Sequence, residues 1–342
     1  MTEHTNKLRV GVIGAGSWGT ALAFLLADRG HDVTLWAYER ECADAINEGN
    51  ENTLYLPGIA LPKNLRATRD LEQACYKQDM IVSVTPSHVT RKVLTDAAAY
   101  LPRHVPIVNA TKGIENESLM TISEILEEVL PIELHPYLAY LSGPSFAREV
   151  ASRHPTAVVV ASYSERLARR VQEAFHHHYF RVYRSNDVIG VEIGGSLKNV
   201  IAIAAGAADG MGFGHNSRAG LISRGLAEMS RLAVARGANP LTLAGLAGMG
   251  DLVLTCTGEL SRNRTVGAKL GQGMSLRAIL DDMKMVAEGV KTAKSVHDMA
   301  LGMGVDLPIC EAVYQVLYED KAPAQALSDL MSRELKRENF GF

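Results

Sequence analysis

The stretch GAGSWGTALA, residues 14–23, decides the fold. It contains the pattern G-x-G-x-x-G at Gly14, Gly16 and Gly19, after the apolar run LRVGVIG and before a helical pattern that ends at Gly30. In such a strand–turn–helix unit the first glycine makes the turn and the second lets the backbone approach a pyrophosphate. The third lets the helix pack on the strand. The stretch therefore predicts a dinucleotide-binding turn, which its flanking elements favour over a tight turn without a ligand.

Apolar runs separated by helical or turn-forming stretches continue through the first half of the chain. They are HDVTLWAY (31–38), DMIVSVTP (79–86), HVPIVNATKG (104–113), YLAYLSGPS (137–145) and TAVVVAS (156–162). Continuous apolar strands between helices are typical of a parallel sheet covered on both faces. The pattern predicts an α/β domain of the Rossmann type, whose ligand binds beyond the carboxyl ends of the strands.

The composition and the residue pattern of the sequence change near Val188. From there on, segments rich in alanine, leucine and methionine are joined by glycine turns, and strand alternation is absent. We therefore expect a Rossmann domain over residues 1–187 and an all-α domain over 188–342. The active site is expected in the cleft between them.

Composition excludes several classes of protein. A length of 342 residues favours two domains, and a net charge of -3 provides no general attraction to nucleic acid or anionic membranes. The four cysteines are scattered, so neither a disulfide framework nor a metal site is predicted. The polar N-terminus is unlike a signal peptide, and no apolar run is expected to reach the roughly 20 residues that span a bilayer. These features predict a cytoplasmic protein without nucleic-acid or membrane partners.

The stretch TLWAYERE, residues 34–41, bears on the choice of dinucleotide. An acid that binds the ribose hydroxyls of NAD is expected at the end of the second strand. Ala37 and Tyr38 occupy that place, and Glu39 and Arg40 follow. An uncharged position near an arginine tolerates a 2′-phosphate, which slightly favours NADPH over NADH. Arg40 is equally consistent with a solvated surface residue, so the preference stays open.

Two lysines are candidates for chemistry. Lys198 lies in GGSLKNVIAIAAGAA beside Gly194 and Gly195 on one helical face. Burial and a cationic neighbour would lower its pKa from about 10.4, as a general base requires. A lysine that extends from the helix end into solvent is the alternative. Lys112, in NATKGIE, follows a strand and could hold an anion or a carbonyl oxygen, or simply open a helix at the surface.

The second half also contains candidate groups for a phosphorylated ligand. Ser261, Arg262 and Asn263 stand at a predicted helix start, an arrangement that suits a phosphate monoester. Asp251 follows two glycines and could orient a lysine ammonium, although aspartates in turns are often structural caps. Glu288 precedes a helix, where capping and a cofactor contact are both possible.

Together these motifs resemble the bacterial NAD(P)-dependent glycerol-3-phosphate dehydrogenase family. The matching stretches run from GAGSWGTALA through NTLYLPG, NATKGIE, SGPSFAREV, GSLKNVIAIAAG, GLAGMGDLVLTCTG and SRNRTVG to VAEGV. The resemblance implies a Rossmann domain followed by a helical domain like the C-terminal domain of 6-phosphogluconate dehydrogenase, commonly in a homodimer. It also implies that dihydroxyacetone phosphate and sn-glycerol 3-phosphate are interconverted with NAD(P)H, in support of phospholipid synthesis.

The resemblance implies roles for individual residues. Lys198 matches the catalytic base. The positions that match substrate contacts are Lys112, Gly143, Ser145, Lys198, Asp251, Ser261, Arg262 and Asn263. Those assigned to the cofactor are Gly14, Gly16, Ser17, Trp18, Gly19, Tyr38, Tyr55, Lys112, Ala147, Arg262, Val286 and Glu288. A ketopantoate-type or other β-hydroxyacid reductase and a non-catalytic NAD(P)-sensing protein are the alternatives.

Overall fold

A computed structural model describes residues 7–283, 287–335 and 337–338. By its contacts the chain divides into two compact units. Unit 1 comprises Met1–Thr111 and Ile122–Val188, and unit 2 comprises Lys112–Thr121 and Ile189–Phe342. The short segment Lys112–Thr121 thus groups with the second half of the chain, a feature that the sequence pattern did not indicate.

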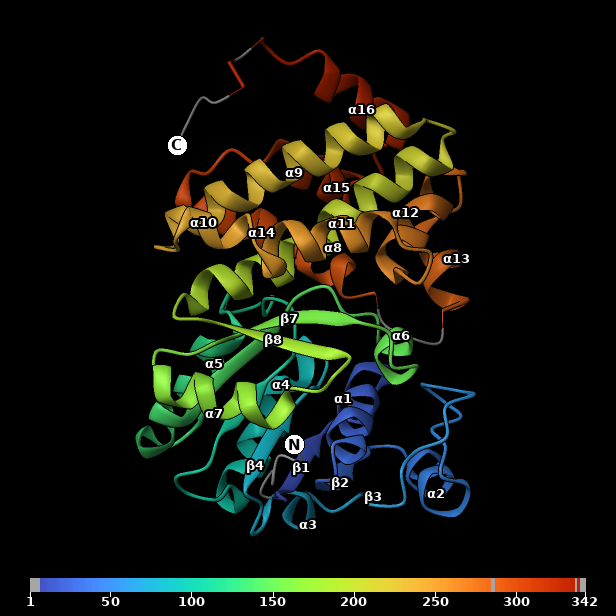
Figure 1. The fold of residues 1–342 in the computed structure, drawn as a ribbon. Helices are drawn as coiled ribbons and strands as arrows, with labels where there is room; N and C mark the ends of the chain where they lie inside the picture. The colour runs from blue at the N-terminus through green and yellow to red at the C-terminus, as the bar shows by residue number, and fades with distance from the viewer. Residues whose placement is uncertain (1–6, 284–286, 336, 339–342) are drawn as a thin grey trace. The chain divides into compact units, whose positions relative to one another are not determined.

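Unit 1 contains one eight-stranded sheet, with the strand order β3-β2-β1-β4-β5-β6-β7-β8. Figure 1 labels β1 to β4, β7 and β8 of this sheet. The strands are β1 (Arg9–Ile13), β2 (Asp32–Trp36), β3 (Leu65–Thr68), β4 (Met80–Ser83), β5 (Ile107–Asn109), β6 (Leu138–Ser142), β7 (Thr156–Ala161) and β8 (Phe180–Ser185). The order β3-β2-β1-β4-β5-β6 is that of the dinucleotide-binding Rossmann fold. The predicted fold class is therefore confirmed for this half.

Two details of the sheet differ from the expected pattern. Strand β7 runs antiparallel to β6, whereas the other neighbouring pairs are parallel. Apolar runs do not encode strand direction, so the sequence could not reveal this reversal. Strands β3 and β8 were not predicted from the sequence. They lie at the two edges of the sheet. Only one of the four residues of β3 is buried, and three of the six residues of β8 are exposed, so the apolar run is broken in both strands.

Helices cover the sheet of unit 1. They are α1 (Ser17–Asp28), α2 (Arg40–Gly49), α3 (Leu71–Cys75), α4 (Ser87–Ala97), α5 (Ile122–Val129), α6 (Ala147–Ala151) and α7 (Glu165–Phe175). Helix α1 is buried along most of its length, and Leu22, Leu25 and Leu26 pack against strand residues such as Val10 and Val12 in one apolar core. This burial fixes the start of α1 directly beyond the end of β1.

Unit 2 is helical, as the sequence predicts. Its helices are α8 (Val188–Gly210), α9 (His215–Ala235), α10 (Pro240–Leu243), α11 (Asp251–Thr257), α12 (Arg262–Gly271), α13 (Leu276–Asp281), α14 (Glu288–Met303), α15 (Pro308–Tyr318) and α16 (Pro323–Met331), and a π-helical turn spans Leu246–Gly250. Small residues let α8 and α12 approach closely. A Cβ on Gly206 would meet the Arg264 carbonyl oxygen at 2.0 Å, and one on Gly267 would meet that of Ile203 at 2.0 Å.

One expectation about membranes needs correction. By length and composition alone, Val188–Gly210 and Pro240–Thr257 are apolar enough to cross a bilayer. The expectation that no run approaches this length is therefore wrong for both segments. Core helices of globular domains pass the same test, and 89% of the apolar window in Val188–Gly210 is buried inside the protein. Helix α8 is the central core helix of unit 2.

Candidate active site

The glycine-rich turn of unit 1 has the geometry that its sequence predicts. Gly14 has a φ of 116°, and a Cβ there would lie 2.6 Å from the carbonyl oxygen of Val84. A Cβ on Gly19 would lie 1.8 Å from the carbonyl oxygen of Gly14, so only glycine allows α1 to pack this closely. A Cβ on Gly16, by contrast, would meet no atom within 4 Å. The backbone at Gly16 is therefore open to a ligand at the start of α1, and the turn fits a dinucleotide pyrophosphate.

Hydrogen bonds fasten the segment around residue 55 to this turn. The Ser17 hydroxyl donates to the Tyr55 carbonyl oxygen at 2.6 Å. The buried Asn52 amide donates to the Ala15 carbonyl oxygen and to the Thr20 hydroxyl, both at 2.8 Å. These contacts bring Tyr55 to the turn although it is distant in sequence.

Other predicted positions, for the cofactor (Trp18, Tyr38 and Ala147) and for the substrate (Gly143 and Ser145), also lie in unit 1. Trp18 packs on the core, and its buried indole N–H has no hydrogen-bond partner among the described residues. Gly143 has a φ of 129° in the turn after β6, where the Ser145 hydroxyl donates to its carbonyl oxygen at 3.0 Å. Ala147 is the first residue of α6. Tyr38 is 74% exposed after β2. All except Tyr38 therefore lie at turns or helix starts that follow β1 or β6.

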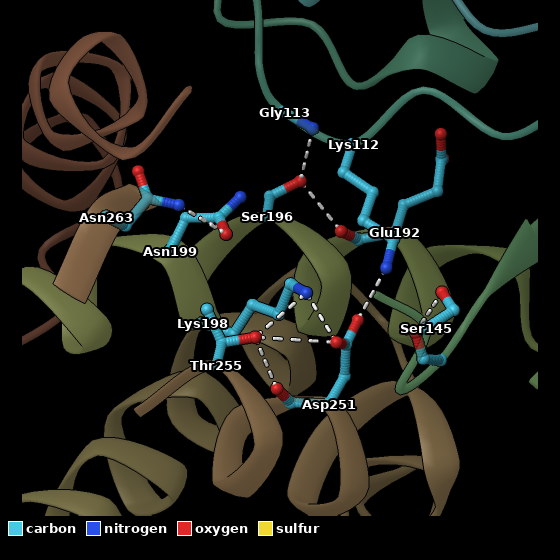
Figure 2. Close-up of polar contacts among 11 residues, drawn as sticks. Lys112, Gly113, Ser145, Glu192, Ser196, Lys198, Asn199, Asp251, Thr255 and Asn263 are labelled. Atoms are coloured by element: carbon cyan, nitrogen blue, oxygen red, sulfur yellow. Dashed lines mark hydrogen bonds and ion pairs between the residues drawn. The ribbon is translucent and has the colours of Figure 1, made fainter. Parts of the chain in front are cut away.

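In unit 2, two lysines share one buried carboxylate (Figure 2). Lys198 donates to Asp251 Oδ1, and Lys112 donates to Asp251 Oδ2 at 2.7 Å. The Lys198 ammonium also donates to the Thr255 hydroxyl at 3.0 Å, and that hydroxyl donates to the Asp251 carbonyl oxygen at 2.6 Å. We call Lys112, Lys198, Asp251 and Thr255 the lysine–aspartate cluster. Asp251 is 0% exposed, so these partners must offset the cost of burying its carboxylate.

Burial and charge give Lys198 an unusual proton affinity. Burial lowers its pKa to about 7, the Asp251 carboxylate opposes that shift, and the Lys112 ammonium adds to it. Near neutral pH the side chain can therefore both accept and donate a proton. This is the property that a general acid–base group needs, and it weighs against a lysine that extends into solvent.

The backbone before Asp251 explains its position. The π-helical turn Leu246–Gly250 ends where α11 begins, so Asp251 occupies the first turn of that helix. Negative charge is favoured there by the helix dipole, and π-helical turns often occur at functional sites. A Cβ on Gly194 would lie 2.5 Å from the Ala247 carbonyl oxygen, so a glycine on α8 lets this turn approach closely. The same helix carries Lys198 one turn later.

The segment 112–121 delivers Lys112 to the cluster. A bridge between Ile114 and Thr121 closes the segment on itself. The N–H of Gly113 donates at 3.1 Å to the hydroxyl of Ser196 on α8 (Figure 2). On α14, Ser295 donates to the Ile114 carbonyl oxygen at 3.2 Å. Two buried hydroxyls thus hold the segment to unit 2.

The predicted phosphate-binding residues stand at the start of α12. The Ser261 hydroxyl caps the helix by accepting from the N–H of Arg264 at 3.2 Å. Arg262 is the first helical residue, and part of its surface is exposed. Crowding by the surrounding protein lowers the pKa of its guanidinium, and the Glu288 carboxylate opposes that shift. Asn263 is buried. Its amide donates to Asn199 Oδ1 at 2.9 Å and accepts from the N–H of Gly289 at 2.9 Å.

These contacts refine the predicted set. Ser261 caps α12, a role that the sequence analysis did not assign to it, and Asn263 connects α12 to α8 and α14. Glu288 is the first residue of α14. Val286 lies outside the described residues. Sequence reasoning missed Thr255 and Ser196. Thr255 follows Asp251 by one helical turn, which was the available signal, whereas nothing near Ser196 in the sequence indicated its contact with Gly113.

Unit 1 is a Rossmann-ordered sheet with a glycine-rich turn, and it is joined in sequence to a helical unit that contains a buried lysine of lowered pKa. These are the parts of a two-domain dehydrogenase that uses a dinucleotide. Comparison with models of known protein families also identifies a dehydrogenase. Residues 9–168 match the NAD-dependent glycerol-3-phosphate dehydrogenase N-terminus, and residues 187–328 match its C-terminus. The chain belongs to the NAD-dependent glycerol-3-phosphate dehydrogenase family.

Known relatives cover nearly the whole chain. A glycerol-3-phosphate dehydrogenase (NAD(P)+) of Geobacter metallireducens is 60% identical over 330 residues, which are 96% of this chain and 98% of the relative. That of Myxococcus xanthus is 58% identical over 334 residues, 98% of this chain and 100% of the relative. A crystal structure of glycerol-3-phosphate dehydrogenase from Coxiella burnetii has a TM-score of 0.91 at 39% identity, covering 96% of this chain and 99% of that one.

The open backbone at Gly16 yields a prediction. Gly16→Ala should leave folding intact, because the added methyl meets no protein atom. It should weaken dinucleotide binding about tenfold or more, roughly 1.4 kcal/mol, because the methyl stands where the phosphates approach the backbone. Binding is measured by titrating the protein with NADH and following nucleotide fluorescence.

Gly49→Ala is the matched control, because its added methyl is equally unobstructed but lies at the end of α2. It should bind NADH normally. Unchanged NADH affinity in Gly16→Ala would exclude a close approach of phosphate to this turn.

Proposed function

We propose that this protein is an NAD(P)-dependent sn-glycerol-3-phosphate dehydrogenase. In the direction of synthesis it reduces dihydroxyacetone phosphate to sn-glycerol 3-phosphate, which supplies glycerophospholipid synthesis. The observation that carries the proposal is the buried Lys198, which has a pKa of about 7 and shares the Asp251 carboxylate with Lys112. Membership of the family and the names of the relatives support the substrate pair.

The two units have different proposed tasks. Residues 1–187 bind the dinucleotide through the turn Gly14–Gly19, whose glycine geometry supports this role. The bound dinucleotide supplies the hydride. Residues 188–342, together with Lys112, hold the substrate and move its proton. The other predicted contacts, among them Tyr38, Ala147, Gly143 and Ser145, remain part of the proposal.

Lys198 is the proposed acid and base. In reduction its ammonium donates a proton to the C2 oxygen of the substrate as negative charge develops there. In oxidation the neutral amine accepts the C2 hydroxyl proton. Such help contributes roughly 10²- to 10⁴-fold to rate. Asp251 orients the ammonium, and Thr255 accepts a second hydrogen from it. Lys112 adds positive potential near the oxygen.

Arg262 is the proposed anchor for the substrate phosphate. It is exposed at the first turn of α12, where backbone N–H groups and the helix dipole also favour an anion. A guanidinium binds phosphate in a bidentate geometry. Ser261 and Asn263 support this site by fixing the helix start.

The alternatives differ in substrate chemistry. A ketopantoate-type or other β-hydroxyacid reductase acts on carboxylates, and family membership favours the phosphorylated substrate. A non-catalytic NAD(P) sensor would have no use for a buried lysine of lowered pKa. We further infer a cytoplasmic homodimer, on the resemblance to the family, without nucleic-acid partners or membrane insertion.

The activity and the role of Lys198 are tested together. Dihydroxyacetone phosphate, but not a 2-oxo acid, should cause loss of NADH or NADPH absorbance with the purified protein. Lys198→Ala should abolish turnover, because the amine that exchanges a proton with the C2 oxygen is lost, and the variant should still bind dinucleotide in a fluorescence titration. Near-normal turnover in Lys198→Ala would sink its role as acid and base, and activity only on 2-oxo acids would favour the reductase alternative.

A pH profile tests the cause of the lowered pKa. Because the Lys112 charge lowers the pKa of Lys198, Lys112→Met should raise it. Oxidation of glycerol 3-phosphate needs the neutral amine, so the rising limb of kcat against pH should move to higher pH. Lys294→Met is the control, because Lys294 lies on α14 and pairs with Asp298 of the same helix. The pH profile of this variant should not move. A profile that stays in place in Lys112→Met would contradict the electrostatic coupling.

Substrate binding provides a separate prediction. Arg262→Ala should chiefly raise KM for dihydroxyacetone phosphate, by about tenfold or more, roughly 1.4 kcal/mol, because a charge-assisted bidentate contact is lost. Arg262→Lys should raise KM by less than Arg262→Ala does, because lysine keeps the positive charge but cannot make the bidentate contact. Arg277→Ala, an exposed change on α13, should leave KM unaltered. An unchanged KM in Arg262→Ala would refute the phosphate assignment.

A further inference from the structure

A carboxylate in unit 1 stands close to the dinucleotide turn. Glu39 Oε1 accepts a hydrogen bond from the hydroxyl of Tyr55 at 2.8 Å. Glu39 is the N-cap residue of α2, but within that fully described helix its side chain accepts no capping hydrogen bond. Its carboxylate is therefore directed to Tyr55 rather than to its own helix.

The backbone places this carboxylate at the end of the second strand. The N–H of Gly14 donates to the carbonyl oxygen of Trp36, the last residue of β2, at 3.1 Å. Glu39 follows Trp36 by only three positions and Gly19 by about 20, the spacing at which Rossmann folds place the acid that binds ribose hydroxyls. The acid that seemed missing at Ala37 and Tyr38 is thus present slightly later.

Tyr55 is well suited to fix this acid. Its carbonyl oxygen accepts from Ser17 in the turn, and its N–H donates to Asn52 Oδ1 at 3.0 Å. Burial raises the pKa of the Tyr55 phenol to about 12, and the neighbouring Glu39 adds to the rise. The phenol therefore stays protonated and acts as the donor. Through Tyr55, the turn and the Glu39 carboxylate are parts of one hydrogen-bonded network.

The nearby arginine does not take part in this network. Arg40 Nε lies 3.6 Å from the Asp44 carboxylate one turn along α2, and the Arg40 side chain is 77% exposed. The sequence-based preference for NADPH depended on this arginine. A positive charge engaged in an exposed ion pair is a weak partner for a 2′-phosphate, because water screens it.

We propose that Glu39, oriented by Tyr55, makes this protein select NADH over NADPH. The carboxylate accepts hydrogen bonds from the free 2′- and 3′-hydroxyls of the adenosine ribose, and it repels a 2′-phosphate. The inference rests on the proposed binding of a dinucleotide by unit 1, and it assigns a specificity-determining residue to that function.

The test is a fluorescence titration of the full chain with NADH and with NADPH, without substrate. The wild-type protein should bind NADH roughly 10- to 100-fold more tightly, as expected when like charges are brought together on binding. Glu39→Gln keeps the size of the side chain and an acceptor for Tyr55 but removes the charge. It should bring the two dissociation constants within about threefold of each other, mainly by improving NADPH binding.

Three further variants separate the causes. Glu41→Gln removes the same charge from an exposed position in the first turn of α2, and it should keep the wild-type preference. Tyr55→Phe retains the charge but releases the carboxylate, and it should reduce the preference partway. Arg40→Ala should leave NADPH binding unchanged.

The outcomes are distinguishable. Equal or tighter binding of NADPH by the wild-type protein, or a preference that survives in Glu39→Gln, would overturn the assignment of Glu39. A selective loss of NADPH binding in Arg40→Ala would do the same. Failure of both nucleotides to bind the wild-type protein would instead contradict the proposed function itself.

Discussion

The helical unit is organised around one buried carboxylate. Asp251 is fully buried and accepts hydrogen bonds from Lys198 and Lys112. An unpaired charge at such a site would cost several kcal/mol, so the carboxylate must be paired, and the fold brings two lysines to it. The same burial lowers the pKa of Lys198 to about 7; the Lys112 ammonium adds to this shift and the Asp251 carboxylate opposes it.

Close backbone packing satisfies this requirement. Gly194 lets the π-helical turn before Asp251 approach α8, and Ser196 and Ser295 hold the segment that carries Lys112. The first contact depends on the missing side chain of Gly194, and the other two depend on the buried hydroxyls of Ser196 and Ser295. Bulk at these positions would separate charges that are costly to leave unpaired. Close packing therefore fixes the positions of the cluster side chains, which the proposed proton transfer requires.

Unit 1 combines tight packing and openness within one turn. Gly14 and Gly19 are crowded by backbone, whereas Gly16 faces open space. The surrounding hydrogen bonds extend this rigidity to Asn52 and Tyr55, and from Tyr55 to the Glu39 carboxylate. The proposed phosphate binding by the backbone and the proposed discrimination by the Glu39 carboxylate thus depend on one network, although the residues come from three separate segments.

The sequence by itself determined the fold class, the glycine turn and the candidate lysines, because strand and helix periodicity and the spacing of glycines are local properties. It could not determine the direction of β7, the edge strands β3 and β8, or which groups surround Lys198. Those depend on contacts between distant segments, such as Lys112 with Asp251 and Gly113 with Ser196. The acid near the second strand was visible as Glu39 but could not be interpreted, since only the tertiary structure brings Tyr55 to it and pairs Arg40 with Asp44.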